Sequence, residues 1–266
     1  MGIMHRILNR QKKIQKSKRV GLALGGGAVL GAAHVGVLRA LDEHNIDIHC
    51  ISGTSIGAFV AAMYAFGKTW RDLDDIAHDL NWLKAARLKV TKTGILSNEQ
   101  MGKFVRSLIG DVKFSDARIR LAMIATDIGT GERVVLNKGD VATALMASTC
   151  IPGIFSPVEI DGRLLVDGGI CENVPVSVLK GMGAERTIAV DLIKNHSLRR
   201  PENIIEVLIN SFDFALSNAA MADGKKADLV IAPHLQHFNA LDVKQIPDLI
   251  EQGYTDAVQL LRKKAR

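Results

Sequence analysis

The chain has 266 residues, of which 47% are hydrophobic, and this suits one α/β domain around a single large core. No apolar run approaches the roughly 18 residues that a transmembrane helix needs, and we expect no secretory signal after the basic N-terminus. Aromatic residues make up only 5% of the chain, and no known nucleic-acid-binding motif occurs. A nucleic-acid partner is therefore not expected.

The net charge of +6 is concentrated near the ends of the chain. Residues 1–19 carry seven Lys and Arg residues and no acidic residue, and apolar side chains such as Ile3 and Ile7 lie among them. A solvated tail explains this pattern. So does peripheral contact with an anionic membrane surface, where each basic residue contributes about 1 kcal/mol. We expect residues 1–19 to form a basic arm and residues 20–266 to form the functional domain.

The three cysteines, Cys50, Cys150 and Cys171, are far apart and odd in number, so they fit neither a disulfide framework nor a zinc site. Reduced thiols in a cytoplasmic protein are the simplest interpretation. Carboxylates and histidines do not converge at the spacings of metal ligands. We therefore expect no metal ion and no cofactor.

Strands and helices alternate in the first part of the chain. Residues 19–24 predict a buried strand that ends at three glycines, and residues 29–44 predict a helix with apolar residues on one face. Residues 46–51 predict the next strand, which leads through a turn at 52–55 into a helix of small residues. This alternation predicts a mainly parallel sheet that is covered on both faces.

The later part of the chain predicts an insertion followed by further strands. Residues 67–115 are mostly helical and polar, and we interpret them as an insertion that could act as a lid. Asp140 is expected to cap a short helix. The remaining strands and helices are expected at 121–127, 133–136, a hairpin of 156–160 with 163–166, and two strand–helix pairs at 187–191 with 202–222 and 229–232 with 245–264.

Residues 53–57 read Gly-Thr-Ser-Ile-Gly and match the pattern G-x-S-x-G. In this pattern a sharp strand-to-helix turn lifts the serine hydroxyl out of the sheet, and the turn is so tight that its neighbours must lack side chains. The helix N-terminus beneath the serine also favours developing negative charge. We therefore predict Ser55 as a nucleophile; a tight structural turn without a catalytic role is the alternative interpretation.

A second glycine-rich turn, GGGAVLG, occupies residues 25–31. Such a turn exposes backbone N–H groups at a helix N-terminus, where they bind a phosphate or a tetrahedral oxyanion. The dinucleotide pattern G-x-G-x-x-G fails in both registers, and no lysine follows Gly31 as a nucleotide P-loop requires. Because a candidate nucleophile lies one strand later, an oxyanion hole fits better than a phosphate site.

Asp167 ends an apolar strand and is followed by two glycines, which leaves its carboxylate facing open space. We predict that this carboxylate accepts the Ser55 proton. An aspartate that only initiates a turn is the alternative interpretation. Asp127 and Asp191 also end predicted strands and are rival bases.

Histidine offers a different catalytic arrangement. His196, His234 or His237 would complete the chain order Ser, Asp, His that α/β-hydrolases use. None of them lies in an obvious catalytic turn, so a triad that contains histidine is disfavoured. His34, on the helix after the glycine-rich turn, is interpreted as a packing or capping residue.

Together these motifs resemble the patatin-like phospholipase family in its small bacterial form, over about residues 20–190. The matching segments are GGAVLG at 26–31, AHVGVL at 33–38, GTSIG at 53–57, AS at 147–148, IPGIF at 151–155, VDGG at 166–169 and NVP at 173–175. The resemblance implies a three-layer α/β/α fold and lipid acyl hydrolysis by a Ser–Asp dyad without histidine.

By motif position, the resemblance places the nucleophile at Ser55 and the base at Asp167. The implied oxyanion donors are the backbone amides of Gly26, Gly27 and Ala28, and the remaining motif glycines are Gly31, Gly53, Gly57, Gly168 and Gly169. The chain departs from the family at two points, because Ala28 replaces the usual third glycine and Leu30 replaces the usual basic residue.

Three functions from different classes follow from the sequence. The leading hypothesis is a serine hydrolase for lipid or other acyl-ester substrates that works through an acyl-enzyme. The second is a catalytically weak lipid-binding or regulatory protein on the same fold, suggested by Leu30 and the basic arm. The third is a His-dependent esterase for small soluble esters.

Overall fold

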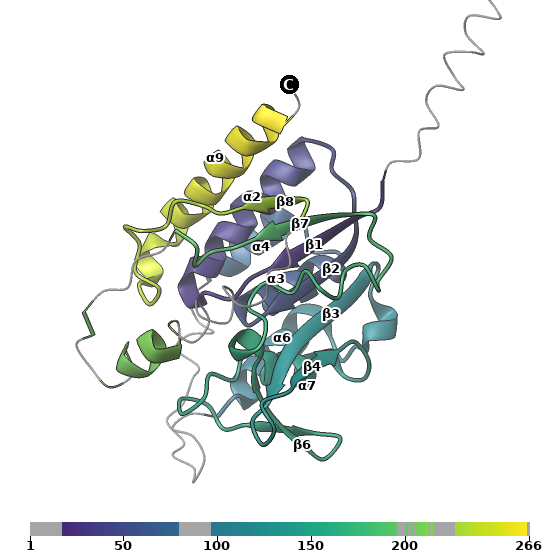
Figure 1. Ribbon diagram of the computed structural model, residues 1–266, viewed down its shortest axis with the longest axis vertical. Helices are drawn as coiled ribbons and strands as arrows, with labels where there is room; N and C mark the ends of the chain where they lie inside the picture. Colours follow the sequence, from purple (N-terminus) through teal and green to yellow (C-terminus); the bar gives the residue numbers. More distant parts are fainter. Residues whose placement is uncertain are drawn as a thin grey trace, which may run out of the picture.

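The computed structural model describes residues 18–79, 97–195, 200–201, 204, 206–212, 214 and 227–264 (Figure 1). Residues 1–17, which make up most of the predicted basic arm, and residues 80–96 in the predicted insertion lie outside this part. Within it, no helix is both long and apolar enough to cross a lipid bilayer.

One mixed sheet forms the centre of the fold (Figure 1). Its strands are β1 (Val20–Leu24), β2 (Ile48–Thr54), β3 (Arg120–Asp127), β4 (Arg133–Leu136), β5 (Val158–Ile160), β6 (Arg163–Asp167), β7 (Arg186–Val190) and β8 (Leu229–Ile231). Strands β3, β2, β1, β7 and β8 lie side by side in parallel, whereas β4 and β6 pair with β3, and β5 pairs with β6, in the antiparallel sense. The predicted α/β class with a mainly parallel sheet is confirmed.

Strand β3 has three partners, and their registers determine how β2 and β6 meet. Ile124 pairs with Thr54 of β2 and with Val135 of β4, so β2 and β4 lie on opposite edges of β3. Ala125 pairs with Val134 of β4 and with Asp167 of β6, so β6 also lies opposite β4. Strands β2 and β6 therefore share one edge of β3 and run toward each other. Their last residues, Thr54 and Asp167, lie opposite consecutive residues of β3.

Helices and the sheet together bury the main hydrophobic core. The helices are α2 (Ala33–Glu43), α3 (Ile56–Ala65), α4 (Trp70–His78), α6 (Glu99–Ile109), α7 (Val141–Ser148) and α9 (Ile246–Lys264), with short 3-10 segments η1 (Ala28–Ala32), η2 (Phe114–Asp116), η3 (Gly168–Ile170) and η4 (Val243–Gln245). Each of these six α-helices contributes side chains to this core, together with strand residues such as Leu22 and Leu24.

The opposite face of the sheet is covered differently. Ala23, Cys50 and Ala189 pack against Val176 and Leu179, which belong to a segment of turns between η3 and β7. The third layer of the fold, as far as the described chain shows it, is thus built largely from this segment.

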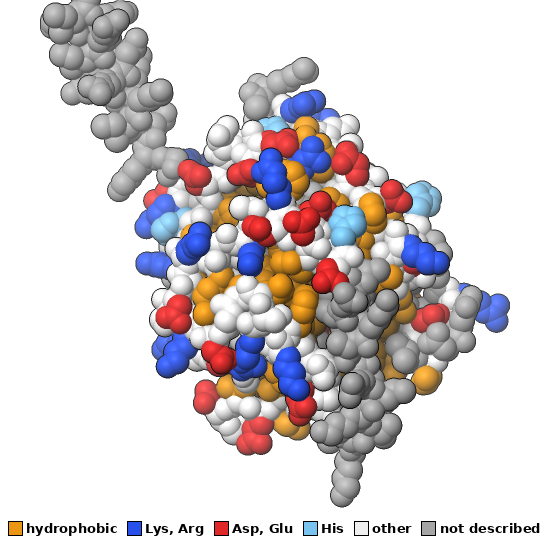
Figure 2. All heavy atoms as spheres, turned by 180° about the vertical axis from the view of Figure 1, so that it is seen from behind, with side chains coloured by type: hydrophobic (Ala, Val, Ile, Leu, Met, Phe, Trp, Pro, Cys, Tyr) orange, Lys and Arg blue, Asp and Glu red, His pale blue; other side chains and the backbone are white. Residues whose placement is uncertain are grey.

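The molecular surface carries mixed charge on the face shown in Figure 2. Lys, Arg, Asp and Glu side chains are intermixed there around apolar ones, and no large area carries a single sign of charge.

Two glycines allow α2 and α9 to touch backbone to backbone. A Cβ on Gly36 would lie 1.9 Å from the Ile250 carbonyl oxygen, and a Cβ on Gly253 would lie 2.2 Å from the Ala33 carbonyl oxygen. Helix α2 follows the glycine-rich turn, and α9 follows η4. This contact therefore fixes the position of two segments that flank the site described below.

Gly36→Ala is expected to destabilise the protein by about 1–3 kcal/mol, because the new methyl group meets a backbone oxygen that no side-chain rotation can relieve. The free energy of unfolding from urea denaturation measures this. Gly181→Ala is the control, since a Cβ there meets only the Val178 carbonyl oxygen, at 3.5 Å. Equal stability of the two variants would contradict the prediction.

Candidate active site

Ser55 lies at the turn between β2 and α3, in a strained backbone conformation with φ 55° and ψ −129°. Such conformations cost about 1–3 kcal/mol and persist where the surroundings hold them. The turn is tight because Gly53 and Gly57 touch: a Cβ on Gly53 would lie 2.3 Å from the Gly57 carbonyl oxygen. A Cβ on Gly57 would in turn lie 2.3 Å from the Leu24 carbonyl oxygen. Both motif glycines are thus required by close backbone contact.

Ser148, the last residue of α7, ties this turn to β3. Its Oγ donates to the Ile124 carbonyl oxygen at 2.7 Å and accepts the Ser55 N–H at 3.2 Å. Ser148 is fully buried. One hydroxyl therefore links the candidate nucleophile to the strand that also pairs with β6.

Asp167 is fully buried at the end of β6, so the expectation that its carboxylate faces open space is wrong. Its amide donates to the Cys150 carbonyl oxygen at 2.8 Å, and its carbonyl oxygen accepts the Thr126 hydroxyl at 3.0 Å. Its carboxylate Oδ1 accepts the Gly169 N–H at 2.9 Å. Gly168 must be a glycine, because a Cβ there would lie 2.3 Å from the Ile124 carbonyl oxygen.

The shared edge of β3 brings Ser55 and Asp167 together. Thr54 pairs with Ile124 and Asp167 with Ala125, so the residue after Thr54 and the carboxylate at the end of β6 arrive at the same place from opposite directions. Within the described residues the Ser55 hydroxyl makes no hydrogen bond. In ligand-free enzymes catalytic hydrogen bonds are often long and tighten only when substrate binds.

The glycine-rich turn lies against this point. The Gly26 N–H donates to Asn173 Oδ1 at 2.9 Å, and a Cβ on Gly26 would lie 3.1 Å from Ser55 Cβ. The Gly26 amide is therefore already engaged. The amides of Gly27 and Ala28 make no hydrogen bond within the described part of the chain, which leaves them available to a ligand.

Ala28 has a φ of 49°, in the left-handed region that favours glycine. An alanine there costs about 1 kcal/mol relative to an unstrained conformation. Leu30, at the usual position of a basic residue, is buried in the main core. The turn thus keeps its shape with a hydrophobic anchor in place of a cation.

An apolar cavity of about 300 Å³ opens beside Ser55. Helices α4 and α6 of the predicted insertion form part of its wall, through Leu73, Ile76 and Met101. The other lining residues come from the glycine-rich turn, α2, α3, the loop after α7, the helix at residue 209, the segment before η4, η4 and α9. They include Ala28, Val29, Val35, Ile56, Phe59, Val60, Ile151, Ile154, Phe155, Ile209, Val243 and Ile246. Such a lining suits a hydrocarbon chain.

The rival bases are engaged elsewhere. Asp127 Oδ1 accepts the Gly129 N–H at 2.9 Å in the turn between β3 and β4. Asp191 Oδ1 accepts the amides of Ile193 and Lys194, each at 3.1 Å. Both carboxylates therefore stabilise local turns.

The histidines also lie apart from Ser55. His234 pairs with Asp256 of α9 at 3.1 Å, and neither it nor His237 lines the cavity. His196 lies outside the described residues. His34 is fully buried and its Nε2 lies 2.8 Å from the Gly25 carbonyl oxygen, so it supports the glycine-rich turn, in line with the packing role predicted for it.

Cys150 is a buried neighbour of Asp167 but is not a nucleophile. Burial, together with the negative charge of Asp167, raises the pKa of the Cys150 thiol to about 12. The thiol therefore stays protonated near neutral pH, and its Sγ lies 3.2 Å from the Ser156 carbonyl oxygen.

Ser148 and Asn173 are the functional residues whose roles the sequence did not reveal. Both belong to segments that match the family motifs, AS at 147–148 and NVP at 173–175, so the signal for their importance was present. Their contacts with Ser55 and Gly26 depend on residues that are 93 and 147 positions apart in the chain, and no local pattern shows these.

A family model described as patatin-like phospholipase matches residues 22–180. An NTE family protein of Mycobacterium bovis is 39% identical over an aligned length of 185 residues, and the match covers 66% of this chain and 49% of that protein. A patatin-like phospholipase domain-containing protein of Caenorhabditis elegans is 33% identical over 69% of this chain and 14% of its own length. The chain thus spans about half of the length of the mycobacterial relative and 14% of the length of the nematode relative.

Solved structures share the fold at low sequence identity. VipD from Legionella pneumophila superposes with a TM-score of 0.57 and 15% identity, over 92% of this chain and 67% of VipD. ExoU from Pseudomonas aeruginosa, in complex with SpcU, gives a TM-score of 0.52 and 14% identity, over 93% of this chain and 53% of ExoU. These similarities support the fold class.

Stability is expected to fall on mild acidification because of His34. Burial lowers the pKa of His34 to about 4, below its ordinary value of 6.5, so between these values the unfolded chain binds a proton that the folded protein excludes. The stability from neutral His34 is complete above pH 6.5 and declines by about 3 kcal/mol as the pH falls to about 4.

Urea midpoints of wild type and His34→Gln at pH 4 to 8 test this, since glutamine retains an N–H donor for the Gly25 carbonyl oxygen. The variant is expected to lose less stability than wild type across that window. Parallel curves for the two proteins would refute the role of His34.

Proposed function

Because the chain belongs to the patatin-like phospholipase family, we propose that it hydrolyses carboxylic esters of lipids with Ser55 as the nucleophile and Asp167 as the base. The observation that carries this proposal is the register of β3. Thr54 and Asp167 lie opposite consecutive residues on one edge of β3, which supports a close approach of Asp167 to Ser55, and Ser55 lines the apolar cavity.

In the proposed reaction Ser55 Oγ attacks the ester carbonyl carbon while the Asp167 carboxylate accepts the hydroxyl proton. The tetrahedral oxyanion accepts hydrogen bonds from the amides of Gly27 and Ala28, with further stabilisation from the N-terminus of α3. Collapse breaks the bond to the leaving alcohol, which takes the proton, and leaves an acyl-enzyme. Water, deprotonated by Asp167, then releases the carboxylic acid and restores Ser55.

The apolar cavity supports a substrate with a hydrocarbon acyl chain. Its lining offers few polar groups besides Ser55 and Thr149, so a polar headgroup would remain outside it. Leu30 supports the competing proposal of a weakly active lipid-binding protein, because a buried leucine cannot supply the positive charge of the usual basic residue. That protein would fill the same cavity without cleaving its ligand.

Ser55→Ala is expected to abolish labelling by a fluorophosphonate and hydrolysis of p-nitrophenyl esters, because it removes the attacking oxygen. Asp167→Asn is expected to lower turnover at least about 100-fold, the usual range for a positioned proton acceptor. The measurements are the extent of fluorophosphonate labelling and the initial rates of hydrolysis of p-nitrophenyl esters of different acyl lengths.

His234→Ala is the control. His234 lies away from the cavity, so this variant should retain full activity. Wild-type protein that is folded but neither labelled nor active would exclude the hydrolase and favour the lipid-binding protein. Residual turnover in Ser55→Ala would exclude Ser55 as nucleophile.

We also propose that the protein contacts a lipid surface through a helix at the cavity. This helix is described at residues 204, 206–212 and 214. Ile209 points into the cavity, whereas Ile204, Val207 and Phe214 are exposed and fall within one arc of about 80° on the opposite side, counted at 100° per residue. A surface helix that is apolar on both sides suits an interface between the cavity and lipid.

Val207→Asp is expected to reduce co-sedimentation with phosphatidylglycerol vesicles several-fold, because it places a charge on the exposed face of this helix. Val230→Asp is the matched control, since Val230 is exposed to a similar extent but lies on edge strand β8. Equal binding by both variants and wild type would exclude the helix as the contact.

A further inference from the structure

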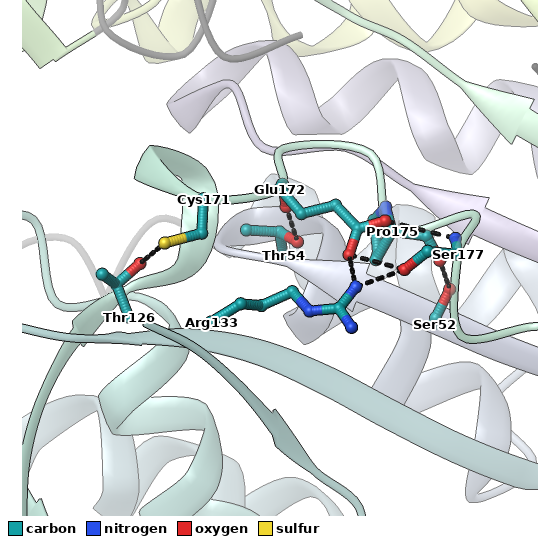
Figure 3. Close-up of polar contacts among 8 residues, drawn as sticks. All are labelled: Ser52, Thr54, Thr126, Arg133, Cys171, Glu172, Pro175 and Ser177. Atoms are coloured by element: carbon teal, nitrogen blue, oxygen red, sulfur yellow. Dashed lines mark hydrogen bonds and ion pairs between the residues drawn. The ribbon is translucent and has the colours of Figure 1, made fainter. Parts of the chain in front are cut away.

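The segment after Asp167 holds a buried carboxylate that the proposed reaction does not use (Figure 3). The side chain of Glu172 is only 3% exposed. It accepts the Ser177 amide at 3.2 Å and the Ser177 hydroxyl at 2.8 Å, and it forms an ion pair with Arg133 of β4. The Arg133 guanidinium also donates to Ser177 Oγ. Arg133 is thus the cation that compensates this buried charge.

The same segment is attached to the strand that carries the nucleophile. The Thr54 hydroxyl donates to the Glu172 carbonyl oxygen at 2.9 Å, and the Ser52 hydroxyl donates to the Pro175 carbonyl oxygen at 2.7 Å. Figure 3 shows both contacts beside the Arg133 ion pair. Two side chains of β2 therefore hold the backbone on either side of Asn173.

Asn173 connects this segment to the glycine-rich turn. Its side chain is buried, and its Oδ1 accepts the Gly26 amide at 2.9 Å. A displacement of residues 172–175 would therefore move or release Gly26. The neighbouring amides of Gly27 and Ala28 are the proposed oxyanion donors, so their placement depends on the same contact.

We propose that Arg133 is a positioning residue for ester hydrolysis: by compensating the buried charge of Glu172 it keeps residues 172–177 packed in place, and through Asn173 it keeps the glycine-rich turn in the conformation that offers the Gly27 and Ala28 amides to substrate. This inference rests on the proposed function. It assigns to Arg133 no contact with the reacting atoms.

Loss of the positive charge and loss of the negative charge of the Arg133–Glu172 ion pair should have different effects, because only Glu172 is buried. Loss of Arg133 leaves a buried carboxylate with only neutral partners, which is costly and is relieved when the segment moves toward water. Loss of the Glu172 charge leaves Arg133 unpaired, but its side chain is 36% exposed and water can solvate it. Removing the cation should therefore impair the site more than removing the anion.

The test compares Arg133→Met, Glu172→Gln and the double variant, by steady-state kinetics on p-nitrophenyl esters well below their melting temperatures. Arg133→Met should lower kcat at least about tenfold with KM changed less than about threefold, since loss of one oxyanion donor costs about 100- to 1000-fold. Glu172→Gln should stay within about threefold of wild type. The double variant should recover most of the lost kcat, because no unpaired charge remains buried.

Arg163→Met is the matched control, because Arg163, the first residue of β6, forms an exposed ion pair at 3.6 Å with Glu132, the residue before Arg133. It should leave kcat unchanged. Hydrogen exchange in a peptide covering residues 22–30 gives a readout independent of catalysis and should be faster in Arg133→Met only. If Arg133→Met does not fold, Arg133→Gln replaces it, since glutamine also removes the charge but can still donate a hydrogen bond.

Unchanged kcat in Arg133→Met, or a loss that the double variant does not recover, would overturn the proposal. So would unchanged hydrogen exchange at residues 22–30. An inactive wild type would instead refute the proposed hydrolase, while the exchange comparison would still decide whether Arg133 holds the glycine-rich turn.

Discussion

The site depends on the way in which two strands divide one edge of β3. β2 pairs with β3 up to Ile124, and β6 takes over at Ala125 from the opposite direction. A strand edge offers each residue one partner on each side, so β2 must stop where β6 arrives. Its chain turns sharply into α3 at that point, and the turn carries Ser55. The strain at Ser55 and the close approach of Gly168 to Ile124 follow from this crowded junction.

Small residues and buried hydroxyls hold the junction together. Gly53, Gly57 and Gly168 permit backbone contacts that any Cβ would prevent. The hydroxyls of Ser148 and Thr126 donate to the carbonyl oxygens of Ile124 and Asp167, which are close to these contacts. Because an unpaired buried carbonyl is costly, these hydroxyls contribute to the stability of the site as well as to its shape.

The parallel sheet also sets the distance between the first strand residue, Val20, and the site. β1 and β2 run in the same direction, with Val20 opposite Ile48 and Leu24 opposite Gly53. Val20 therefore lies at the opposite end of the parallel strands from Ser55, about 20 Å away at 3.3 Å per residue. The apolar helix around residues 204–214, which lies at the cavity, is better placed than the point where the arm joins the sheet to bring the site to a lipid surface.

The sequence by itself determined the α/β class, most strands to within a few residues, the Asp140 cap and the candidate dyad, because hydrophobic period, turn residues and motif spacing are local properties. It placed the end of β2 too early, at residue 51, since Ser52 and Thr54 are polar and bury their hydroxyls only against residues 172–175. It predicted one helix at 29–44, where η1 precedes α2.

Only the tertiary structure decided that Gly26 donates to Asn173 and that Arg133 neutralises Glu172. Those contacts join segments that are 147 and 39 residues apart, and their geometry depends on the strand order of the folded sheet.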